Sequence, residues 1–330
     1  MNKSKLKIGS VELPYGVMLA PMAGFTDRAM RLICREHGAE YTVTEMVSAK
    51  AVTYGDKKTF NLAKIGVDEG PVAIQIFGRE PDVMARAAEI MSEAREGYAA
   101  PVAIDINMGC PVNKVYSNGE GSALMKSPEL IEKIVLAVKG VTNLPCTVKM
   151  RVGIDESTIN AVDCALAAES GGADAIAVHG RTKKQMYSGR ADREIIKIVK
   201  QSLQIPLIAN GDVTSADEAL DMFSVTGADG IMIGRGAIGN PFLFEEVLAR
   251  LKGEEYSPPT IEQRCEAALR QLSLAISDKG EGVAVKESRK QIALYISSFR
   301  GAAAIRARIN RAESYGEVRE ALLDAELHEE

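Results

Sequence analysis

Short apolar runs alternate with amphipathic stretches along most of the chain. Eight runs are rich in small and β-branched aliphatic residues, as expected for strands buried on both faces. They cover residues 17–20, 41–44, 72–76, 102–106, 145–150, 175–178, 206–209 and 230–233. In the intervening stretches, apolar positions recur with helical spacing, as at residues 81–94 and 128–141. The alternation predicts parallel strands joined by right-handed helical crossovers.

The number of strands predicts a closed barrel. Eight strand–helix units close a (β/α)8 TIM barrel, and the roughly 235 residues that hold them approach the ~250 typical of that fold. An open doubly wound sheet is the alternative, but no G-x-G-x-x-G motif follows the first run. Two helix starts are marked, by a predicted capping box at Ser215–Glu218 and by Pro128 at a first helical position. We therefore predict an α/β fold built on a TIM barrel.

The pattern changes after residue 252. Residues 253–260 have the Gly, Ser and Pro content of a linker, and only helical patterns follow them. These patterns cover residues 261–278, 283–299 and 305–311, with a turn at 301–304 and an acidic tail from Glu313. The sequence thus predicts a TIM-barrel domain over residues 1–252, a linker over 253–260 and a small all-α helical domain over 261–330.

Composition favours a soluble protein of a reducing compartment. Apolar residues make up 46% of the chain, which is ample for a large core, and the five cysteines include no C-x-x-C pair. This cysteine usage argues against a disulfide framework and against a zinc site. The N-terminus has no apolar signal region, and no apolar run approaches the ~18–20 residues that span a bilayer. We therefore expect a cytoplasmic monomer without membrane association or bound metal.

Polar and charged side chains follow nearly every predicted strand. In a TIM barrel, the C-terminal ends of the strands carry the catalytic and binding residues. A structural role is easy to assign to any single one of these residues, but their convergence on one rim predicts a site. The candidates are Pro21, Met22, Ala23, Glu45, Gln75, Asn107, Cys110, Lys149, Arg151, His179, Arg181, Asn210, Gly211, Asp212, Gly234 and Arg235.

Cys110 lies in the sequence Asn-Met-Gly-Cys-Pro, directly after the apolar run 102–106. A free cysteine is commonly buried as a small hydrophobic residue. Here, however, Gly109 and Pro111 mark the end of a strand, so Cys110 is expected on a loop. A thiol in that place can meet a substrate.

The last two strand ends indicate a phosphate site. Asn210-Gly-Asp212 and Gly234-Arg-Gly236 follow strands seven and eight, where such barrels commonly bind phosphate through backbone N–H groups. Lys149 adds a cation, Gln75 an amide, and Met22 with Ala23 a small apolar surface for a flat ring. The rim therefore fits a flavin with a thiol proton donor opposite it. Metal catalysis is disfavoured, because the chain has three histidines and no metal-ligand spacing.

Several motifs occur in a fixed order along the predicted barrel. They are Ala20-Pro-Met-Ala23, Asp105-Ile-Asn-Met-Gly-Cys-Pro-Val112 with Lys114-Val115, Gly121-Ser-Ala-Leu124, Lys149-Met-Arg151, Val178-His-Gly-Arg181, Asn210-Gly-Asp212 and Ile233-Gly-Arg235. This set resembles the tRNA-dihydrouridine synthases, and in particular their bacterial B-type branch. The resemblance runs over nearly the whole predicted barrel and extends more weakly into the helical region.

The resemblance implies FMN as the prosthetic group, NADPH as the electron source and reduction of the uracil C5=C6 bond in tRNA. It makes Cys110 the acid that protonates C5 after hydride reaches C6, and it places Asn107 and Arg151 beside the uracil. An ordinary thiol pKa of ~8.5 keeps such an acid protonated at neutral pH. The resemblance places around the flavin Pro21, Met22, Ala23, Gln75, Lys149, His179, Asn210, Gly211, Asp212, Gly234 and Arg235.

Two other functions stay open on the residues alone. A flavin barrel with a loop cysteine could act on a free pyrimidine such as dihydroorotate. A phosphate-binding barrel without flavin could be an aldolase, an isomerase or an RNA-binding scaffold. A basic helical region favours the RNA substrate, since an enzyme of small molecules has no need of one.

The helical region carries an uneven charge. The chain has a formal net charge of −5, yet residues 279–311 hold eight basic and two acidic residues. This asymmetry predicts a docking face for the phosphates of tRNA, with a solvated helix face as the alternative. We expect Arg289, Lys290 and Arg306 to contact the RNA. The basic residues are Lys279, Lys286, Arg289, Lys290, Arg300, Arg306, Arg308 and Arg311.

Overall fold

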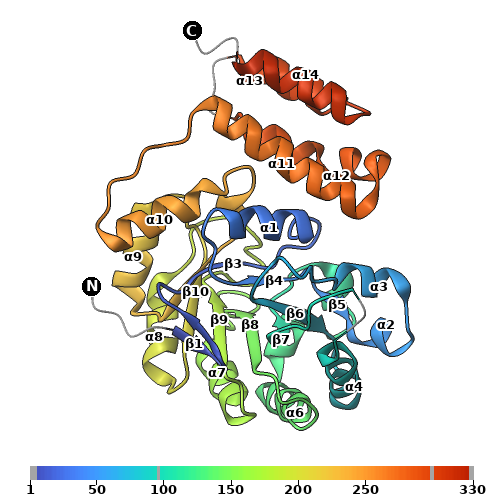
Figure 1. Ribbon diagram of the computed structural model, residues 1–330. Helices are drawn as coiled ribbons and strands as arrows, with labels where there is room; N and C mark the ends of the chain where they lie inside the picture. Colours follow the sequence, from blue (N-terminus) through green and yellow to red (C-terminus); the bar gives the residue numbers. More distant parts are fainter. Residues whose placement is uncertain (1–5, 95–96, 298–300, 327–330) are drawn as a thin grey trace.

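A barrel of eight parallel strands forms the centre of the molecule. The computed structural model describes residues 6–94, 97–297 and 301–326 (Figure 1). The strands pair in the order β3-β11-β10-β9-β8-β7-β6-β4, and a parallel bridge between Met18 and Tyr41 joins the two ends of this order. The predicted TIM barrel is therefore confirmed. The strands are β3 (Val17–Leu19), β4 (Thr42–Val43), β6 (Val72–Phe77), β7 (Ala103–Met108), β8 (Cys146–Arg151), β9 (Ala175–His179), β10 (Leu207–Asn210) and β11 (Gly230–Ile233), and short β5 (Val47–Ser48) pairs with β6.

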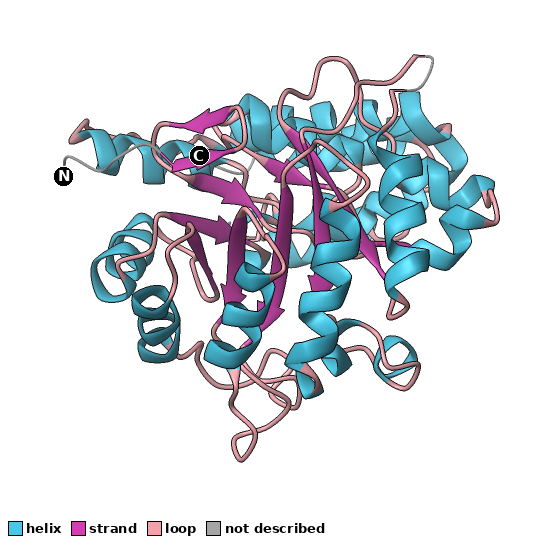
Figure 2. Cartoon of the chain, turned by 90° about the horizontal axis from the view of Figure 1, so that it is seen from below, coloured by secondary structure: helices cyan, strands magenta, loops and turns pink. Residues whose placement is uncertain are grey.

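Helices surround the barrel strands (Figure 2). Their apolar faces pack against the outer faces of the strands, which supply β-branched residues such as Ile74, Ile104 and Val148. The helices are α1 (Arg28–Glu36), α2 (Ala49–Thr53), α3 (Lys57–Leu62), α4 (Pro81–Ser92), α5 (Asn113–Tyr116), α6 (Pro128–Lys139), α7 (Ala161–Ser170), α8 (Arg193–Ser202), α9 (Ala216–Thr226) and α10 (Phe242–Lys252). Two short 3-10 helices, η1 (Gly121–Lys126) and η2 (Arg235–Ala237), follow β7 and β11.

A hairpin that sequence reasoning did not identify closes one end of the barrel. Strands β1 (Leu6–Ile8) and β2 (Val11–Leu13) pair in antiparallel fashion, and their apolar side chains join the small residues of the barrel interior. Leu6 lies against Gly230, the first residue of β11. The hairpin therefore covers the N-terminal ends of the strands and leaves the opposite rim open.

In the described part of the C-terminal region, four further helices lie above α1 and α10 in Figure 1. They are α11 (Ile261–Lys279), α12 (Glu281–Leu294), α13 (Ala302–Ile309) and α14 (Tyr315–Glu326), and residues 253–260 connect them to the barrel without regular structure. Helix α11 packs on α1 through a small apolar cluster that includes Leu32 and Leu274. Within the described parts of the chain, none of the helices has the length and apolar character needed to cross a membrane.

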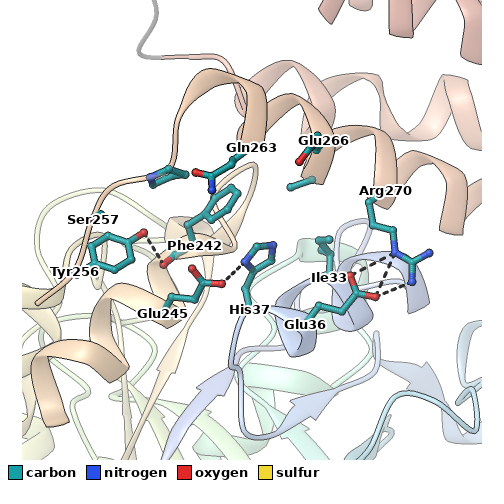
Figure 3. Close-up of a pocket in the computed structure, with 12 residues that line it drawn as sticks. Ile33, Glu36, His37, Phe242, Glu245, Tyr256, Ser257, Gln263, Glu266 and Arg270 are labelled. Carbon is teal, nitrogen blue, oxygen red and sulfur yellow. Dashed lines mark hydrogen bonds and ion pairs between the residues drawn. The ribbon is translucent and has the colours of Figure 1, made fainter. Parts of the chain in front are cut away.

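Polar contacts and a cavity lie where α11 meets α1 and α10 (Figure 3). Arg270 of α11 forms an ion pair with Glu36 at 2.7 Å, and His37 Nδ1 lies 2.7 Å from a carboxylate oxygen of Glu245 on α10. Between them lies a cavity of about 350 Å³. A second contact is tighter: a Cβ added at Gly239, just after η2, would lie 2.5 Å from the Cβ of Leu294. The helical region therefore touches the barrel both at α1 and beside the open rim.

The structure corrects three predictions of local structure. The acidic stretch after Glu313 is not a tail, because α14 buries Val318, Ala321 and Leu322. Residues 302–304, predicted as a turn, are the first turn of α13, and Gly301 before them has a φ of +85°. At the start of α9, Ser215 accepts the N–H of Glu218, but the Glu218 carboxylate accepts from Thr214 instead of returning to Ser215.

Candidate active site

A cleft of about 670 Å³ opens at the C-terminal ends of the barrel strands. It brings together residues from loops that are far apart in the sequence, and it holds the proposed acid, the proposed flavin contacts and the proposed uracil neighbours. Every barrel residue that the resemblance assigns to the site lines this cleft: Pro21, Met22, Ala23, Gln75, Asn107, Cys110, Lys149, Arg151, His179, Asn210, Gly211, Asp212, Gly234 and Arg235.

Cys110 lies two residues after the end of β7, on a loop that is held from three sides. Asn107 Oδ1 accepts the backbone N–H groups of Cys110 at 2.9 Å and of Gly109 at 3.2 Å. The carbonyl of Cys110 accepts the N–H of Ser122 at 3.1 Å. Gly121 has a φ of +59°, and a Cβ there would lie 3.0 Å from the Cβ of Cys110. The loop therefore has little room to move.

The surroundings of Cys110 keep its thiol protonated. Burial raises the pKa of Cys110 above its ordinary value, and this effect outweighs a backbone hydrogen bond from Val112 and the charge of Arg151, which both lower it. A thiol with a raised pKa is a poor nucleophile at neutral pH but can still give up its proton. The other four cysteines are buried and lie outside the residues that line the cleft.

Lys149 is a half-buried cation that lines the cleft. Its ammonium donates to Asn210 Oδ1 at 2.9 Å, and Asn210 is oriented in turn by a bond from its Nδ2 to the carbonyl of Met232. Burial and the charge of Arg151 lower the pKa of Lys149 to about 8, while Asp105 opposes them. At pH 7 the side chain is therefore charged, and an anionic ligand would stabilise that charge.

Arg151 holds two loops of the rim. Its Nε donates to the carbonyl of Gly109 at 3.0 Å, and its Nη1 donates to the carbonyls of Thr182 at 2.8 Å and Met186 at 2.9 Å. Met186 adopts a φ of +52°, which is uncommon for a residue other than glycine. Because these partners are neutral, the positive charge of Arg151 is not cancelled by them.

The rim after β9, β10 and β11 has the features of an anion site. Arg181 is buried and donates to Asp212 Oδ2 at 2.7 Å, while Asp212 also accepts the N–H of Ala191 at 2.8 Å. Arg235 is half exposed, and its guanidinium carbon lies 4.6 Å from the ring centroid of Tyr187. Its Nη2 also lies 3.5 Å from Asp212 Oδ1, so Arg235 is held by an aromatic face and by a long ion pair, and its half-exposed side chain can still meet a phosphate.

Two glycines and a neutral histidine complete this end of the cleft. Gly211 has a φ of +130°, and a Cβ there would lie 2.5 Å from the Cβ of Ala191. At Gly234 the nearest atom to such a Cβ is the sulfur of Met22, 3.7 Å away, so the backbone is open to a ligand. Burial, followed by the nearby cations, strongly lowers the pKa of His179, which keeps its ring neutral.

Two functional candidates escaped the sequence reasoning. Tyr187 lines the cleft beside Arg235, and an exposed aromatic residue in a polar loop after a strand end was the available signal. Asp105 lies inside the barrel and contacts Gln75. Its signal was a single acidic residue within an otherwise apolar run.

The three predicted RNA contacts lie in the helical region, outside the residues that line the cleft. Lys290 is exposed on α12, and Arg306 donates to the carbonyl of Ser297 at 3.2 Å. Arg289 is held by the carbonyl of Ala312 and by Glu313.

Three other cations of that region pair with carboxylates, whereas Arg311 donates to the carbonyl of Ala307. Lys279 pairs with Asp27 and Glu287, Lys286 with Glu313, and Arg308 with Asp324. Arg300 lies outside the residues that the structure describes.

The arrangement can bind an anion and deliver a proton at one place. Lys149, Arg151 and Arg235 give the cleft a positive potential, and the Cys110 thiol can protonate a ligand held there. For the residues with described positions, the structure contains no group of three or more His, Cys, Asp or Glu side chains placed to hold a metal ion.

Comparison with known proteins identifies close relatives. The sequence profile of the family described as Dihydrouridine synthase (Dus) matches residues 18–329. The chain is 41% identical over 307 residues to a probable tRNA-dihydrouridine synthase of Rickettsia conorii, with 92% of this chain and 91% of that protein covered. It is 39% identical over 296 residues to tRNA-dihydrouridine synthase B of Pasteurella multocida, with 89% and 87% covered. For tRNA-dihydrouridine synthase B of Pseudomonas aeruginosa the identity is 38% over 313 residues, with 93% and 92% covered.

A solved structure supports the fold. Histamine dehydrogenase from Rhizobium sp. 4-9 superimposes with a TM-score of 0.56 at 13% identity, over 82% of this chain and 50% of that one. At this low identity the likeness concerns only the barrel architecture.

Proposed function

Because this chain belongs to the dihydrouridine synthase family and resembles its bacterial B-type members, we propose that it reduces specific uridines of tRNA to 5,6-dihydrouridine. In this proposal FMN is the prosthetic group and NADPH is the reductant. The observation that carries the proposal is the position of Cys110. Its protonated thiol lines the same cleft as the half-buried ammonium of Lys149 and the half-exposed guanidinium of Arg235.

The residues of the cleft fit a flavin with a phosphate tail. A cleft of about 670 Å³ is within the range that small-molecule cofactors occupy. The open backbone at Gly234, beside Met22, leaves a flat apolar surface for a ring. Lys149 donates to the amide of Asn210 and, among the residues that the structure describes, forms no ion pair with a carboxylate, so its charge is available to an anionic ring. We assign Arg235 and the backbone around Gly211 to the phosphate.

When bound and reduced, the flavin supplies the hydride that reaches C6 of the uracil. The thiol of Cys110 donates the proton to C5, so that two C–H bonds form as the C5=C6 π bond breaks. The resulting thiolate then takes a proton from solvent. Asn107 and the Arg151 guanidinium hold the Cys110 loop through Oδ1 and through the Gly109 carbonyl, and we assign both to the uracil side of the cleft.

The substrate must enter as a single base. A uridine stacked in folded RNA cannot reach the bottom of the cleft, so we propose that it is extruded at a cost of a few kcal/mol. Contacts to phosphates elsewhere on the tRNA offset that cost. We assign these contacts to residues 261–330, with exposed Lys290 and half-buried Arg306 among the cations that contact RNA, and catalysis to residues 1–252.

Replacement of Cys110 tests the proposal. Cys110→Ala should reduce dihydrouridine formation by about 100-fold or more, since a positioned general acid contributes about that much. It should keep the visible flavin spectrum and the oxidation of NADPH with an artificial electron acceptor. Dihydrouridine is measured by mass spectrometry of tRNA that initially lacks it. Cys34→Ala, which changes a buried cysteine outside the cleft, is the matched control and should stay active. Full turnover by Cys110→Ala on tRNA would overturn the assignment.

A further inference from the structure

Asp105 lies inside the barrel beneath the cleft and is linked to the Cys110 loop by a chain of hydrogen bonds. The parallel register places Gln75, Asp105 and Thr147 side by side on β6, β7 and β8. Gln75 Nε2 donates to Asp105 Oδ2 at 2.6 Å, and Thr147 Oγ1 donates to Asp105 Oδ1 at 2.5 Å. One step further along β7, Asn107 Nδ2 donates to Gln75 Oε1 at 2.8 Å.

The groups at both ends of this series of hydrogen bonds require the same orientation of the two amides. At the upper end, Asn107 faces the backbone N–H groups of Gly109 and Cys110, which can only donate and therefore require its oxygen. At the lower end, Gln75 faces a carboxylate, which can only accept when ionised and therefore requires its NH2 group. The two amides between them can satisfy both ends in one orientation only.

Burial makes this orientation costly to change. Asp105 is 2% exposed, Gln75 1% and Asn107 9%. Water therefore has little access to replace a lost bond, and a buried donor without an acceptor is strongly disfavoured. If the Gln75 amide turned over, its NH2 group would face the NH2 group of Asn107. Asn107 would then turn as well and present a donor to the two N–H groups of the Cys110 loop.

We propose that Asp105 is a positioning residue that fixes the amide orientations of Gln75 and Asn107 and thereby holds the Cys110 loop in place. Asp105 does not line the cleft, so it acts through the other two side chains. The importance of this loop for catalysis rests on the proposed function, but the positioning itself does not. It can be measured on the full chain without tRNA.

The rate at which iodoacetamide alkylates Cys110 reports on the loop. The half-buried thiol has a pKa that burial raises, and the other four cysteines are buried. Release of the loop exposes the thiol, lowers its pKa and speeds alkylation. Peptide mass spectrometry identifies which cysteine reacts, and Cys110→Ala confirms the assignment of the signal.

Three variants distinguish the effect of the amide orientation from the effect of the Asp105 charge and from the loss of a buried hydrogen bond. Asp105→Ala removes the acceptor and should raise the alkylation rate of Cys110 about fivefold or more. Asp105→Asn can still present its oxygen to Gln75, with its NH2 group toward the Thr147 hydroxyl, and should stay within about twofold of the unmodified chain. Thr147→Val removes an equally buried bond to the same carboxylate, leaves Gln75 in place and should also stay within about twofold.

Each other outcome overturns the inference. An unchanged rate in Asp105→Ala means that the loop does not depend on this residue. An equal increase in Asp105→Asn means that charge matters and direction does not. Reaction at Cys34, Cys146 and Cys164 together with Cys110 means general loosening of the fold.

A second variant tests the same inference if Asp105→Ala does not fold. Asp105→Ser has a hydroxyl that can donate or accept, so it leaves the Gln75 amide free to turn and should also raise the rate. A rate within twofold of the unmodified chain in that variant overturns the inference as well. None of these results depends on dihydrouridine formation, so a chain that fails to reduce uridine would leave the positioning result intact.

Discussion

The cleft and the C-terminal helices both hold several cations, but they treat them in opposite ways. In the cleft, Arg151 is buried and Lys149 is half-buried, and both donate to neutral oxygen atoms of amides and carbonyls. In the helical region, Arg289 and Arg308 lie near the surface and pair with Glu313 and Asp324. A charge count alone ranks the helical region as the stronger anion site. The partners in space favour the part of the cleft around Lys149 and Arg151, whose partners are neutral, whereas Arg181 and Arg235 of the same cleft pair with Asp212.

The difference has a physical cause. A neutral partner satisfies the N–H groups of a buried cation without removing its charge, so the charge remains available to a ligand. A carboxylate on the surface removes most of the field of its partner, and salt screens the rest. In the helical region, for example, the single carboxylate of Glu313 pairs with both Lys286 and Arg289.

The largest effect that we expect from this contrast is that of Arg151→Met. The change leaves the carbonyls of Gly109, Thr182 and Met186 without their donor. The free energy of unfolding in urea should fall by about 2–4 kcal/mol, because buried hydrogen bonds to a charged group are lost. Dihydrouridine formation in a single-turnover assay should fall by about 100-fold or more, as expected when a catalytic group is displaced. A loss of stability below about 1 kcal/mol would contradict the role of Arg151 as the link between the two loops.

The charge of Lys149 should make FMN binding depend on pH. Its pKa of about 8 means that the amine is protonated below pH 8 and neutral above it. The affinity for FMN, measured by fluorescence quenching, should therefore fall as the pH rises through 8, by up to about tenfold between pH 7 and 9. Lys149→Met should bind weakly and without this pH dependence. Lys290→Gln, which removes a surface ammonium, should keep it. The same slope in Lys149→Met would assign the titration to another group.

The surface cations should contribute less, and unequally. The double variant Lys290→Gln/Arg306→Gln should weaken tRNA binding about threefold to tenfold and reduce the salt slope of the affinity by about 1.4–1.8, since each phosphate contact contributes about 0.7–0.9. Filter binding over a range of salt concentrations measures both quantities. Arg308→Gln is the matched control, because Asp324 already pairs with that charge. If Arg308→Gln weakened binding as much as the double variant, the distinction between paired and open cations would be wrong.

The smallest expected effect is on stability in the helical region. Arg308→Met removes an ion pair whose side chains are 44% and 46% exposed. Its free energy of unfolding in urea should change by less than about 1 kcal/mol, the usual range for surface pairs. A loss as large as that of Arg151→Met would remove the contrast between the two regions.

The sequence predicted the barrel well because both faces of its strands are buried. Runs such as 102–106 and 145–150 lie within a residue or two of β7 and β8, and the strand ends carry the residues that line the cleft. Parallel topology alone brings Cys110, Lys149 and Arg235 to one rim. That inference requires no knowledge of side-chain contacts.

What the sequence could not predict depends on partners in space. Glu313 was predicted to lie in an acidic tail, but it forms two ion pairs with basic residues of α12. Helix α14 was missed because charged residues, mostly acidic, surround its apolar positions Val318, Ala321 and Leu322. Asp105 looked like an interruption of a strand, and only the register with Gln75 and Thr147 gives it partners.

The contact between Gly239 and Leu294 has a consequence for how RNA meets the enzyme. The backbone just after Arg235–Ala237 and the end of α12 approach so closely that no Cβ fits between them. The distance between the helical region and the cleft therefore depends on position 239 being a glycine. If α12 binds the RNA as proposed, the contact between Gly239 and Leu294 determines how far a nucleotide must move out of the RNA before it reaches the Cys110 thiol. A methyl group at position 239 would lie 2.5 Å from the Cβ of Leu294, so the end of α12 would have to move away from the loop after η2.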